Sequence, residues 1–147
     1  MKFSGEHKVS IDLKGRVSIP ASFRDELRQK YDSVGLVVTR YKNGLVAYPP
    51  PRWEEICANV FSMPPGPKRE ANIRSRIAPA KECSFNAQGR IQIPQSLREH
   101  AGLDKDVVVV GMFEKIEIWS QIAHTLIAAE SESMLDEDAQ GQADLGF

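Results

Sequence analysis

The sequence predicts a mixed fold of β-strands and α-helices that is built from two similar halves. Two observations predict it. First, residues 9–24 align without gaps on residues 83–98 when the 147-residue chain is shifted by 74 positions, which indicates an internal repeat. Second, apolar and polar residues alternate in both copies and then give way to helical spacing, a pattern typical of half-buried strands followed by an amphipathic helix.

The two copies agree at the positions that define their local structure. Both have the same glycine and arginine at a turn and the same proline before a helix. The identical pairs are Ser10/Ser84, Gly15/Gly89, Arg16/Arg90, Ile19/Ile93, Pro20/Pro94, Ser22/Ser96 and Arg24/Arg98. Such agreement over so short a span is too close for chance, and we therefore treat the repeat as real.

Each copy begins with a strand, a tight turn and a second strand. The turn is Leu13-Lys14-Gly15 in the first copy and Ala87-Gln88-Gly89 in the second. A glycine at the third turn position can adopt the left-handed backbone conformation that closes such hairpins. Pro20 and Pro94 end the second strand, because proline cannot donate to a ladder, and they favour the start of a helix.

Each copy ends in a further hairpin. In the first copy, residues 35–39 and 45–48 flank Asn43-Gly44, which is a strong turn signal. In the second copy, residues 107–110 and 116–119 are the corresponding strands.

Helices are expected between and after the two copies. Apolar residues from Trp53 to Phe61 fall at helical spacing until a proline-rich segment interrupts them. A last helix is expected to use apolar residues from Trp119 to Ile127. We divide the chain into a first repeat with its helix at 1–63, a linker with a short basic helix at 64–79, a second repeat with a C-terminal helix at 80–129, and an acidic tail at 130–147.

Charge is unevenly distributed along the chain. The formal net charge is −1, which by itself argues against binding to nucleic acid. However, residues 130–147 contain six acids and no Lys or Arg, so residues 1–129 hold 19 bases and 14 acids and have a formal charge of +5. The body is therefore basic. The tail has no sustained apolar period, and we expect it to be disordered.

The composition argues against several classes of function. No apolar run approaches the roughly 20 residues of a membrane-spanning helix, and no secretory signal is recognised, so we expect a cytoplasmic protein without a membrane partner. Neither Cys57 and Cys83 nor the histidines have the spacing of a metal site or a catalytic triad. We therefore expect no enzyme, and no catalytic residue, metal, cofactor or small-molecule substrate.

The candidate functional residues lie at the two turns. Asp12 and Arg16 flank a three-residue loop, so they face each other across the hairpin and can form an ion pair, with Lys14 between them. An arginine fork binds a guanine edge or a phosphate through two parallel hydrogen bonds. Gly15 leaves the backbone open to the close approach of a ligand. A two-stranded ribbon also fits the major groove of DNA.

A purely structural role is the alternative for a single hairpin, because exposed ion pairs are common and contribute only about 0–1 kcal/mol. The repeat favours a ligand contact instead: Gly-Arg recurs in the second copy, whereas Asn86 stands in the place of Asp12. Retention of the arginine without its acidic partner is expected if the arginine contacts a ligand. The candidate DNA-binding residues are Asp12, Lys14, Gly15, Arg16, Asn86, Gln88, Gly89 and Arg90.

These motifs resemble those of the MraZ family. The resemblance rests, in this order, on Gly5-Glu6, Asp12 to Pro20, Gly35 to Arg40, Gln88 to Pro94, Ala101 to Lys105 and Ile116 to Trp119. It implies a bacterial transcription regulator related to the AbrB and MazE folds. In such a fold, two swapped-hairpin, AbrB-like β-barrel halves form a pseudo-dimer within one chain, with flanking helices.

The resemblance also implies a ligand and an assembly. Members of the family form ring-shaped homo-oligomers and bind short direct repeats of double-stranded DNA at the promoter of their own division and cell-wall gene cluster, which implies association with the nucleoid. Their contact motif, an Asp and an Arg separated by three residues, falls on Asp12 and Arg16. In the second copy it falls on Asn86 and Arg90, with Asn in place of Asp.

A protein-interaction module is the alternative from a different class. An antitoxin-like or scaffold protein could wrap its acidic, extended end around a partner, and residues 130–147 have the composition for this role. The sequence leaves the ring size, the DNA repeat and the sign of regulation open.

Overall fold

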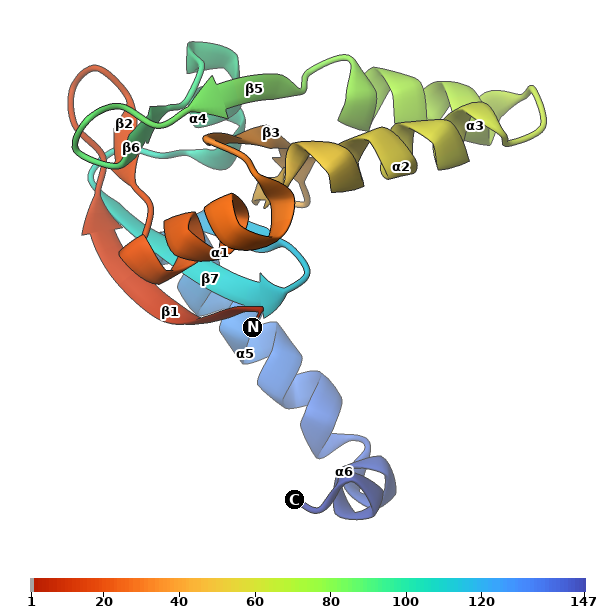
Figure 1. Ribbon diagram of the computed structural model, residues 1–147. Coiled ribbons are helices and arrows are strands. Elements are labelled where there is room, and N and C mark those ends of the chain that lie inside the picture. The colour runs from red at the N-terminus through yellow and green to blue at the C-terminus, as the bar shows by residue number, and fades with distance from the viewer. Residues whose placement is uncertain (1) are drawn as a thin grey trace.

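The structure is a computed structural model that describes residues 2–147, and it has a sheet-based body from which two helical arms extend (Figure 1). The strands are β1 (Phe3–Ser10), β2 (Arg16–Ser18), β3 (Gly35–Tyr41), β4 (Gly44–Tyr48), β5 (Lys81–Ser84), β6 (Arg90–Gln92), β7 (Asp106–Phe113) and β8 (Ile116–Ser120). The helices are α1 (Ala21–Tyr31), α2 (Pro50–Phe61), α3 (Pro67–Asn72), α4 (Gln95–Ala101), α5 (Gln121–Asp136) and α6 (Ala139–Leu145), with a π-helical turn, η1 (Ile73–Ile77), after α3. The mixed fold with flanking helices is thereby confirmed.

The main sheet combines strands of both copies of the repeat. Its order is β1-β7-β8-β4-β3-β5. Strand β1 of the first copy is antiparallel to β7 of the second, from Phe3 opposite Phe113 to Ser10 opposite Asp106. In the same way, β5 of the second copy pairs with β3 of the first, and the two hairpins join at the centre through β4 and β8. Each copy therefore supplies an outer strand to the sheet of the other.

Strands β2 and β6 form a separate two-stranded sheet, which we call the ribbon. The alternating sequence pattern predicts a ladder within each copy, between the strands before and after the turn. The structure corrects this expectation: within the first copy, the described residues form an isolated bridge between Ile11 and Val17, and β2 pairs with β6 of the other copy. The pattern fits both arrangements, because it identifies the buried face of a strand and not its neighbour.

The hydrophobic core lies between the main sheet, the ribbon and helices α1 and α4. Phe23 and Leu27 of α1 and Leu97 and Ala101 of α4 are buried in it. In each helix the two residues are four positions apart, which places them on one face. Figure 1 shows α1 lying next to β1. The helix that follows each turn thus anchors that turn to the core.

An AbrB-like β-barrel, which resemblance to the MraZ family implies, is not confirmed. In residues 2–147 the main sheet ends at β1 on one side and at β5 on the other. The sheet is therefore open at both edges and forms no closed barrel.

The C-terminal segment is helical, and the disorder expected for residues 130–147 is wrong for the stretches that α5 and α6 cover. Helix α5 begins after Ser120, whose hydroxyl accepts a hydrogen bond from the backbone N–H of Ala123 at 3.0 Å, and continues through residue 130 to Asp136. Helix α6 begins after Asp138, which accepts a hydrogen bond from the N–H of Gly141 at 3.2 Å. Such caps satisfy the donors that a helix start leaves unpaired, and the Ala, Leu, Met and Glu residues of the segment favour helix despite its charge.

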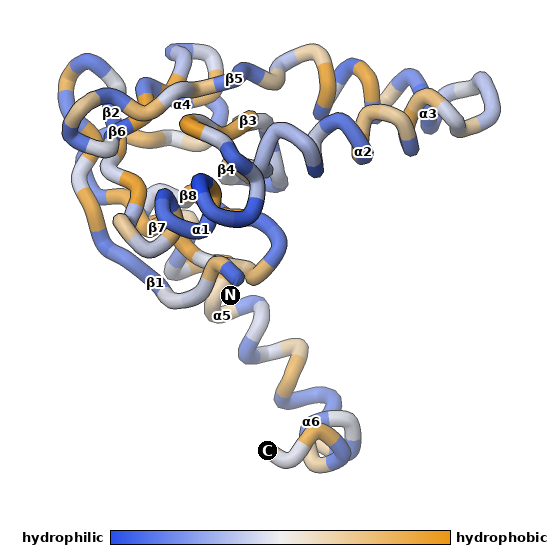
Figure 2. Tube along the Cα trace, viewed as in Figure 1, coloured by the Kyte–Doolittle hydropathy of each residue, from blue (hydrophilic) through white to orange (hydrophobic). Residues whose placement is uncertain are grey.

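The two arms differ in charge as well as in direction (Figure 1). We call α2, α3 and η1 the basic arm, because residues 50–77 hold five bases and three acids. We call α5 and α6 the acidic arm, because residues 121–147 hold six acids and no Lys or Arg. Figure 2 shows that polar and apolar segments alternate along both arms.

A matched pair of leucine substitutions tests this assignment of the core. Leu27 is 0% exposed, whereas Leu13 at the turn is 105% exposed. We expect Leu27→Ala to lower the free energy of unfolding by about 2–5 kcal/mol, because it removes buried contacts and leaves a cavity. We expect Leu13→Ala to change it by less than about 0.5 kcal/mol. Urea denaturation of both variants measures the difference, and equal losses would contradict the fold.

Candidate nucleic-acid interface

The ribbon has one apolar face and one polar face. Val17 and Ile91 lie opposite each other at its centre and are both 0% exposed, so they face the core. Neighbouring residues of a strand point to opposite faces. The residues on the outer face are therefore Arg16, Ser18, Arg90 and Gln92, with Arg16 opposite Gln92 and Ser18 opposite Arg90. Two arginines from distant parts of the chain thus lie on one side of the ribbon.

Asp12 organises the turn of the first copy. Its Oδ1 accepts hydrogen bonds from the backbone N–H groups of Lys14 at 3.0 Å and Arg16 at 2.9 Å. Its Oδ2 accepts a hydrogen bond from Nε of Arg16 at 2.6 Å, so the ion pair expected between Asp12 and Arg16 is confirmed. The backbone N–H of Arg16, together with the other hydrogen bonds, holds the pKa of Asp12 below its ordinary value. The carboxylate is therefore charged at neutral pH.

Asp12 also binds the arginine of the other turn. Nη1 of Arg90 lies 3.2 Å from Oδ2 of Asp12, across a sequence separation of 78 residues. This contact corrects the inference that Arg90 lacks an acidic partner because Asn86 replaces an aspartate. One carboxylate serves two guanidinium groups, so the persistence of arginine in both copies does not by itself distinguish a ligand contact from an ion pair.

Asn86 keeps the structural part of the aspartate's role. Its Oδ1 accepts hydrogen bonds from the backbone N–H groups of Gln88 at 3.0 Å and Arg90 at 2.9 Å, as Asp12 does in the first copy. An amide oxygen serves this purpose as well as a carboxylate oxygen. What the second turn lacks is the negative charge, and the two turns together therefore have an excess of positive charge.

The space beside each turn glycine is filled by an arginine of the opposite copy. A Cβ on Gly15 would overlap the guanidinium of Arg98, and a Cβ on Gly89 would overlap that of Arg24. Both glycines have a positive φ, +79° and +75°, which favours glycine for a second reason. The open backbone expected at Gly15 for the approach of a ligand is therefore occupied by Arg98.

Arg24 and Arg98 lie beside the candidate interface, although they are not among its eight candidate residues. Nε of Arg24 donates to the carbonyl of Ile19 at 3.1 Å, and Nη1 of Arg98 donates to the carbonyl of Ile93. Each side chain is thereby held at the end of a ribbon strand. The signal that could have identified them is their identity in the two copies.

The tips of the two turns are exposed. Lys14, Ala87 and Gln88 lie at the surface, and Leu13 is fully exposed. Gln92 of β6 donates a hydrogen bond from Nε2 to the carbonyl of Lys14 at 2.9 Å, so the second copy supports the tip of the first. The eight candidate residues of the sequence thus fall at one site, on two adjoining turns.

Residues 2–147 hold no candidate metal site and no candidate membrane-spanning helix. No group of three or more His, Cys, Asp or Glu residues could hold a metal ion, and no helix in this range is long and apolar enough to cross a membrane. The histidines have local partners: His7 packs edge-on against Phe23 with ring centroids 5.3 Å apart, His100 contacts the carbonyl of Lys42 at 2.8 Å, and His124 lies 3.8 Å from Glu6.

Known proteins of one family are similar to this chain over almost its whole length. The family model described as "MraZ protein, putative antitoxin-like" matches residues 2–73 and 77–145. A protein named "Transcriptional regulator MraZ" from Syntrophotalea carbinolica is 41% identical over 150 residues, covering 100% of both chains. Proteins of the same name are 38% identical over 99% of both chains in Halothermothrix orenii, and 43% identical over 81% of this chain and 79% of the relative in Syntrophobacter fumaroxidans.

Alanine substitutions of two glycines test the packing of arginine over the turn. Gly15 and Gly102 both have a positive φ, +79° and +63°, but only Gly15 has an arginine at the position of a Cβ. We expect Gly102→Ala to cost about 1–2 kcal/mol, the strain of the left-handed conformation. We expect Gly15→Ala to cost more, because Arg98 must also move. Thermal unfolding measures the difference, and equal costs for the two variants would contradict the packing.

Proposed function

The chain belongs to the MraZ family, and on this premise we propose that it is a transcriptional regulator that binds double-stranded DNA sequence-specifically. Its target in this proposal is the promoter of its own division and cell-wall gene cluster, and its place in the cell is the cytoplasm, associated with the nucleoid. The ribbon and its two Gly-Arg turns are the proposed contact surface.

The observation that carries this proposal is the pairing of β2 with β6, which brings Arg16 and Arg90, both partly exposed, onto the outer face of the ribbon. The major groove of B-DNA is about 12 Å wide and admits a two-stranded antiparallel ribbon. Both arginines are tethered to Asp12, so their forks are oriented before DNA arrives. Such preorganisation lowers the entropic cost of binding.

The charges around the ribbon support a polyanionic ligand. Arg24 and Arg98 add two guanidinium groups beside the turns, and Lys14 is exposed at the first tip. Six of the 20 acidic residues lie on the acidic arm, which extends away from the end of the body that carries β2 and β6 (Figure 1). Phosphate contacts made by these bases release counterions from DNA and therefore weaken as salt rises.

A ring-shaped homo-oligomer is the proposed form in which the chain binds direct repeats. Both arms expose apolar side chains, which are available for contact with further copies: Phe61 on the basic arm, and Ile122, Leu126, Met134 and Leu145 on the acidic arm. A head-to-tail contact that closes produces a ring. Linking several ribbons makes the second and later contacts intramolecular and raises the overall affinity for repeated sites.

We also propose that the fold is related to the AbrB and MazE class. The support is the exchange of strands between the two copies of the repeat, with β1 on β7 and β5 on β3. In this proposal the two copies are the halves of a pseudo-dimer within one chain.

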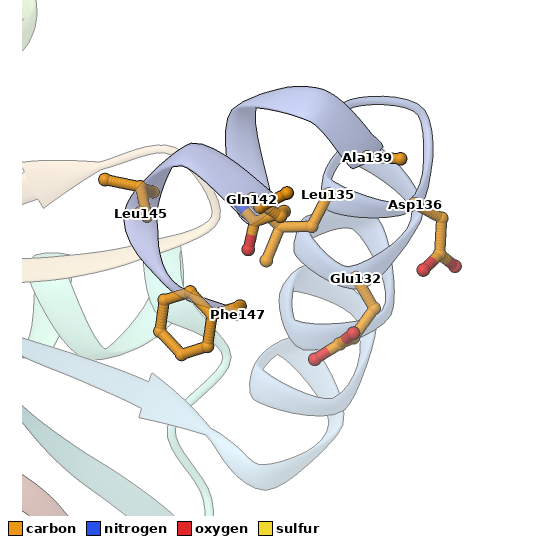
Figure 3. Close-up of a pocket in the computed structure, with 8 residues that line it drawn as sticks. Glu132, Leu135, Asp136, Ala139, Gln142, Leu145 and Phe147 are labelled. Carbon is orange, nitrogen blue, oxygen red and sulfur yellow. The ribbon is translucent and has the colours of Figure 1, made fainter.

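An antitoxin-like or scaffold function is the second candidate, and the acidic arm favours it. Between α5 and α6 lies a hollow lined partly by apolar residues, and Figure 3 shows Leu135, Leu145 and Phe147 around it. Leu145 and Phe147 are 73% and 92% exposed. Apolar side chains among acidic ones suit a basic, amphipathic protein partner.

Substitution of the two ribbon arginines tests the DNA-binding proposal. We expect Arg16→Ala and Arg90→Ala each to weaken binding to the DNA upstream of the protein's own gene by about 5- to 150-fold, the range for loss of a good bidentate base contact. A mobility-shift assay with a salt series measures the affinity. We also expect the affinity of the unaltered protein to fall steeply as salt rises.

Lys30→Gln is the matched control, because it removes one positive charge from the surface at a position on the last turn of α1. It should bind DNA nearly as well as the unaltered protein. Unchanged binding by both arginine variants would overturn the proposed contact surface. Absence of DNA binding, together with a stoichiometric protein partner that is lost on deletion of the acidic arm, would favour the second candidate.

A further inference from the structure

We infer that the turn residues that differ between the two copies set the direction in which the chain binds DNA, with Leu13-Lys14 and Ala87-Gln88 contacting different half-sites. This inference rests on the proposed function and deepens it. It concerns the symmetry of the ribbon, whose backbone is nearly two-fold and whose tips are not.

The backbone of the ribbon is symmetric about its centre, where Val17 pairs with Ile91. The N–H of Ile19 donates to the carbonyl of Gly89 at 3.1 Å, and the N–H of Ile93 donates to the carbonyl of Gly15 at 2.8 Å. The two hydrogen bonds join equivalent positions of the repeat, with the donor in one copy and the acceptor in the other. The arginines that pack over the two glycines are related in the same way, because each lies in the other copy from its glycine.

The side chains at the tips break this symmetry. The first tip presents a large apolar residue and a cation, and the second presents a methyl group and a neutral amide; the pairs are Leu13/Ala87 and Lys14/Gln88. All four side chains are exposed, so the difference lies at the surface that a ligand meets. The packing of the core does not require this difference, because none of the four side chains is buried.

The contacts that hold the tips are also unequal. Gln92 supports the first tip through its hydrogen bond to the carbonyl of Lys14. Its counterpart in the repeat is Ser18, whose side chain is too short to reach across in the same way. The only acidic group found to pair with Arg16 and Arg90 in residues 2–147 is Asp12, which belongs to the first turn. The first tip is therefore held by more contacts than the second.

Symmetry of a protein surface is reflected in the symmetry of the DNA site that it prefers. A ribbon with identical tips would favour a palindromic site, because each tip would meet the same base pairs. With these tips, Lys14 suits the acceptors of guanine or a phosphate, whereas Gln88 suits the paired acceptor and donor of adenine. The leucine also offers more apolar contact to a thymine methyl group than the alanine does.

The inference is tested by making the two tips alike in the full-length protein. The variant Ala87→Leu/Gln88→Lys gives the second turn the exposed tip residues of the first and leaves Asn86 and Arg90 in place. Preferred sites are selected from random duplexes that hold one site, and their affinities are then measured by mobility shift. We expect the unaltered protein to select a non-palindromic site and to bind it about 5-fold or more tightly than either palindrome made from its halves.

The variant should instead prefer the palindrome made from the half-site of the first tip. The reverse variant, Leu13→Ala/Lys14→Gln, should prefer the other palindrome. The matched control is Ala58→Leu/Gln29→Lys, the same chemical changes at exposed positions on α2 and α1, and it should keep the site of the unaltered protein.

The possible outcomes separate the inference from the proposed function. If the unaltered protein selects no DNA site, the proposed function fails, and the inference fails with it. If it selects a palindrome, or if both tip variants keep its non-palindromic site, DNA binding stands and the inference is overturned.

Discussion

Strand β2 has three residues, and its ladder partner lies in the other copy of the repeat, at Arg90–Gln92 of β6. The candidate interface depends on this pairing. It buries Val17 and Ile91 against the core and thereby fixes which residues of the two strands face outward. It also brings together two turns that are 74 residues apart in the sequence. Without the exchange of strands, the two Gly-Arg turns would be separate hairpins.

The electrostatics of the site follow from the same pairing. Asp12 contacts Arg90 as well as Arg16 because the two turns adjoin, and the second aspartate can then be replaced by Asn86 without loss of the turn. The substitution leaves both arginines oriented and adds to the positive charge of the surface. A carboxylate shared in this way is a positioning group, since its effect on a ligand is exerted through the arginines.

Much of the fold could be predicted from the sequence, because repeats, turn glycines and helix-starting prolines are local signals. The order of strands and helices, and the Asp12–Arg16 pair, follow from such signals. The partners of β1, β2 and β5 could not be predicted, since an alternating pattern is the same whichever strand lies alongside. The contact between Asp12 and Arg90, the packing of Arg98 over Gly15 and the open edges of the sheet depend on that choice. The acidic composition of residues 130–147 predicted disorder, but helix caps and helix-forming residues outweigh the effect of the charge there.

A double-mutant cycle for DNA binding shows whether the two turns act as one surface. Residues in one ion-pair network do not contribute additively, with coupling energies of about 0.5–3 kcal/mol. Affinities of Arg16→Ala, Arg90→Ala and the double variant are measured at low salt. Phosphate contacts are strong there, so the binding of the weakest variant can still be measured. We expect the double variant to lose less binding free energy than the sum of the two single losses, by at least about 0.5 kcal/mol. Additive losses would contradict this expectation, because they would describe two independent hairpins.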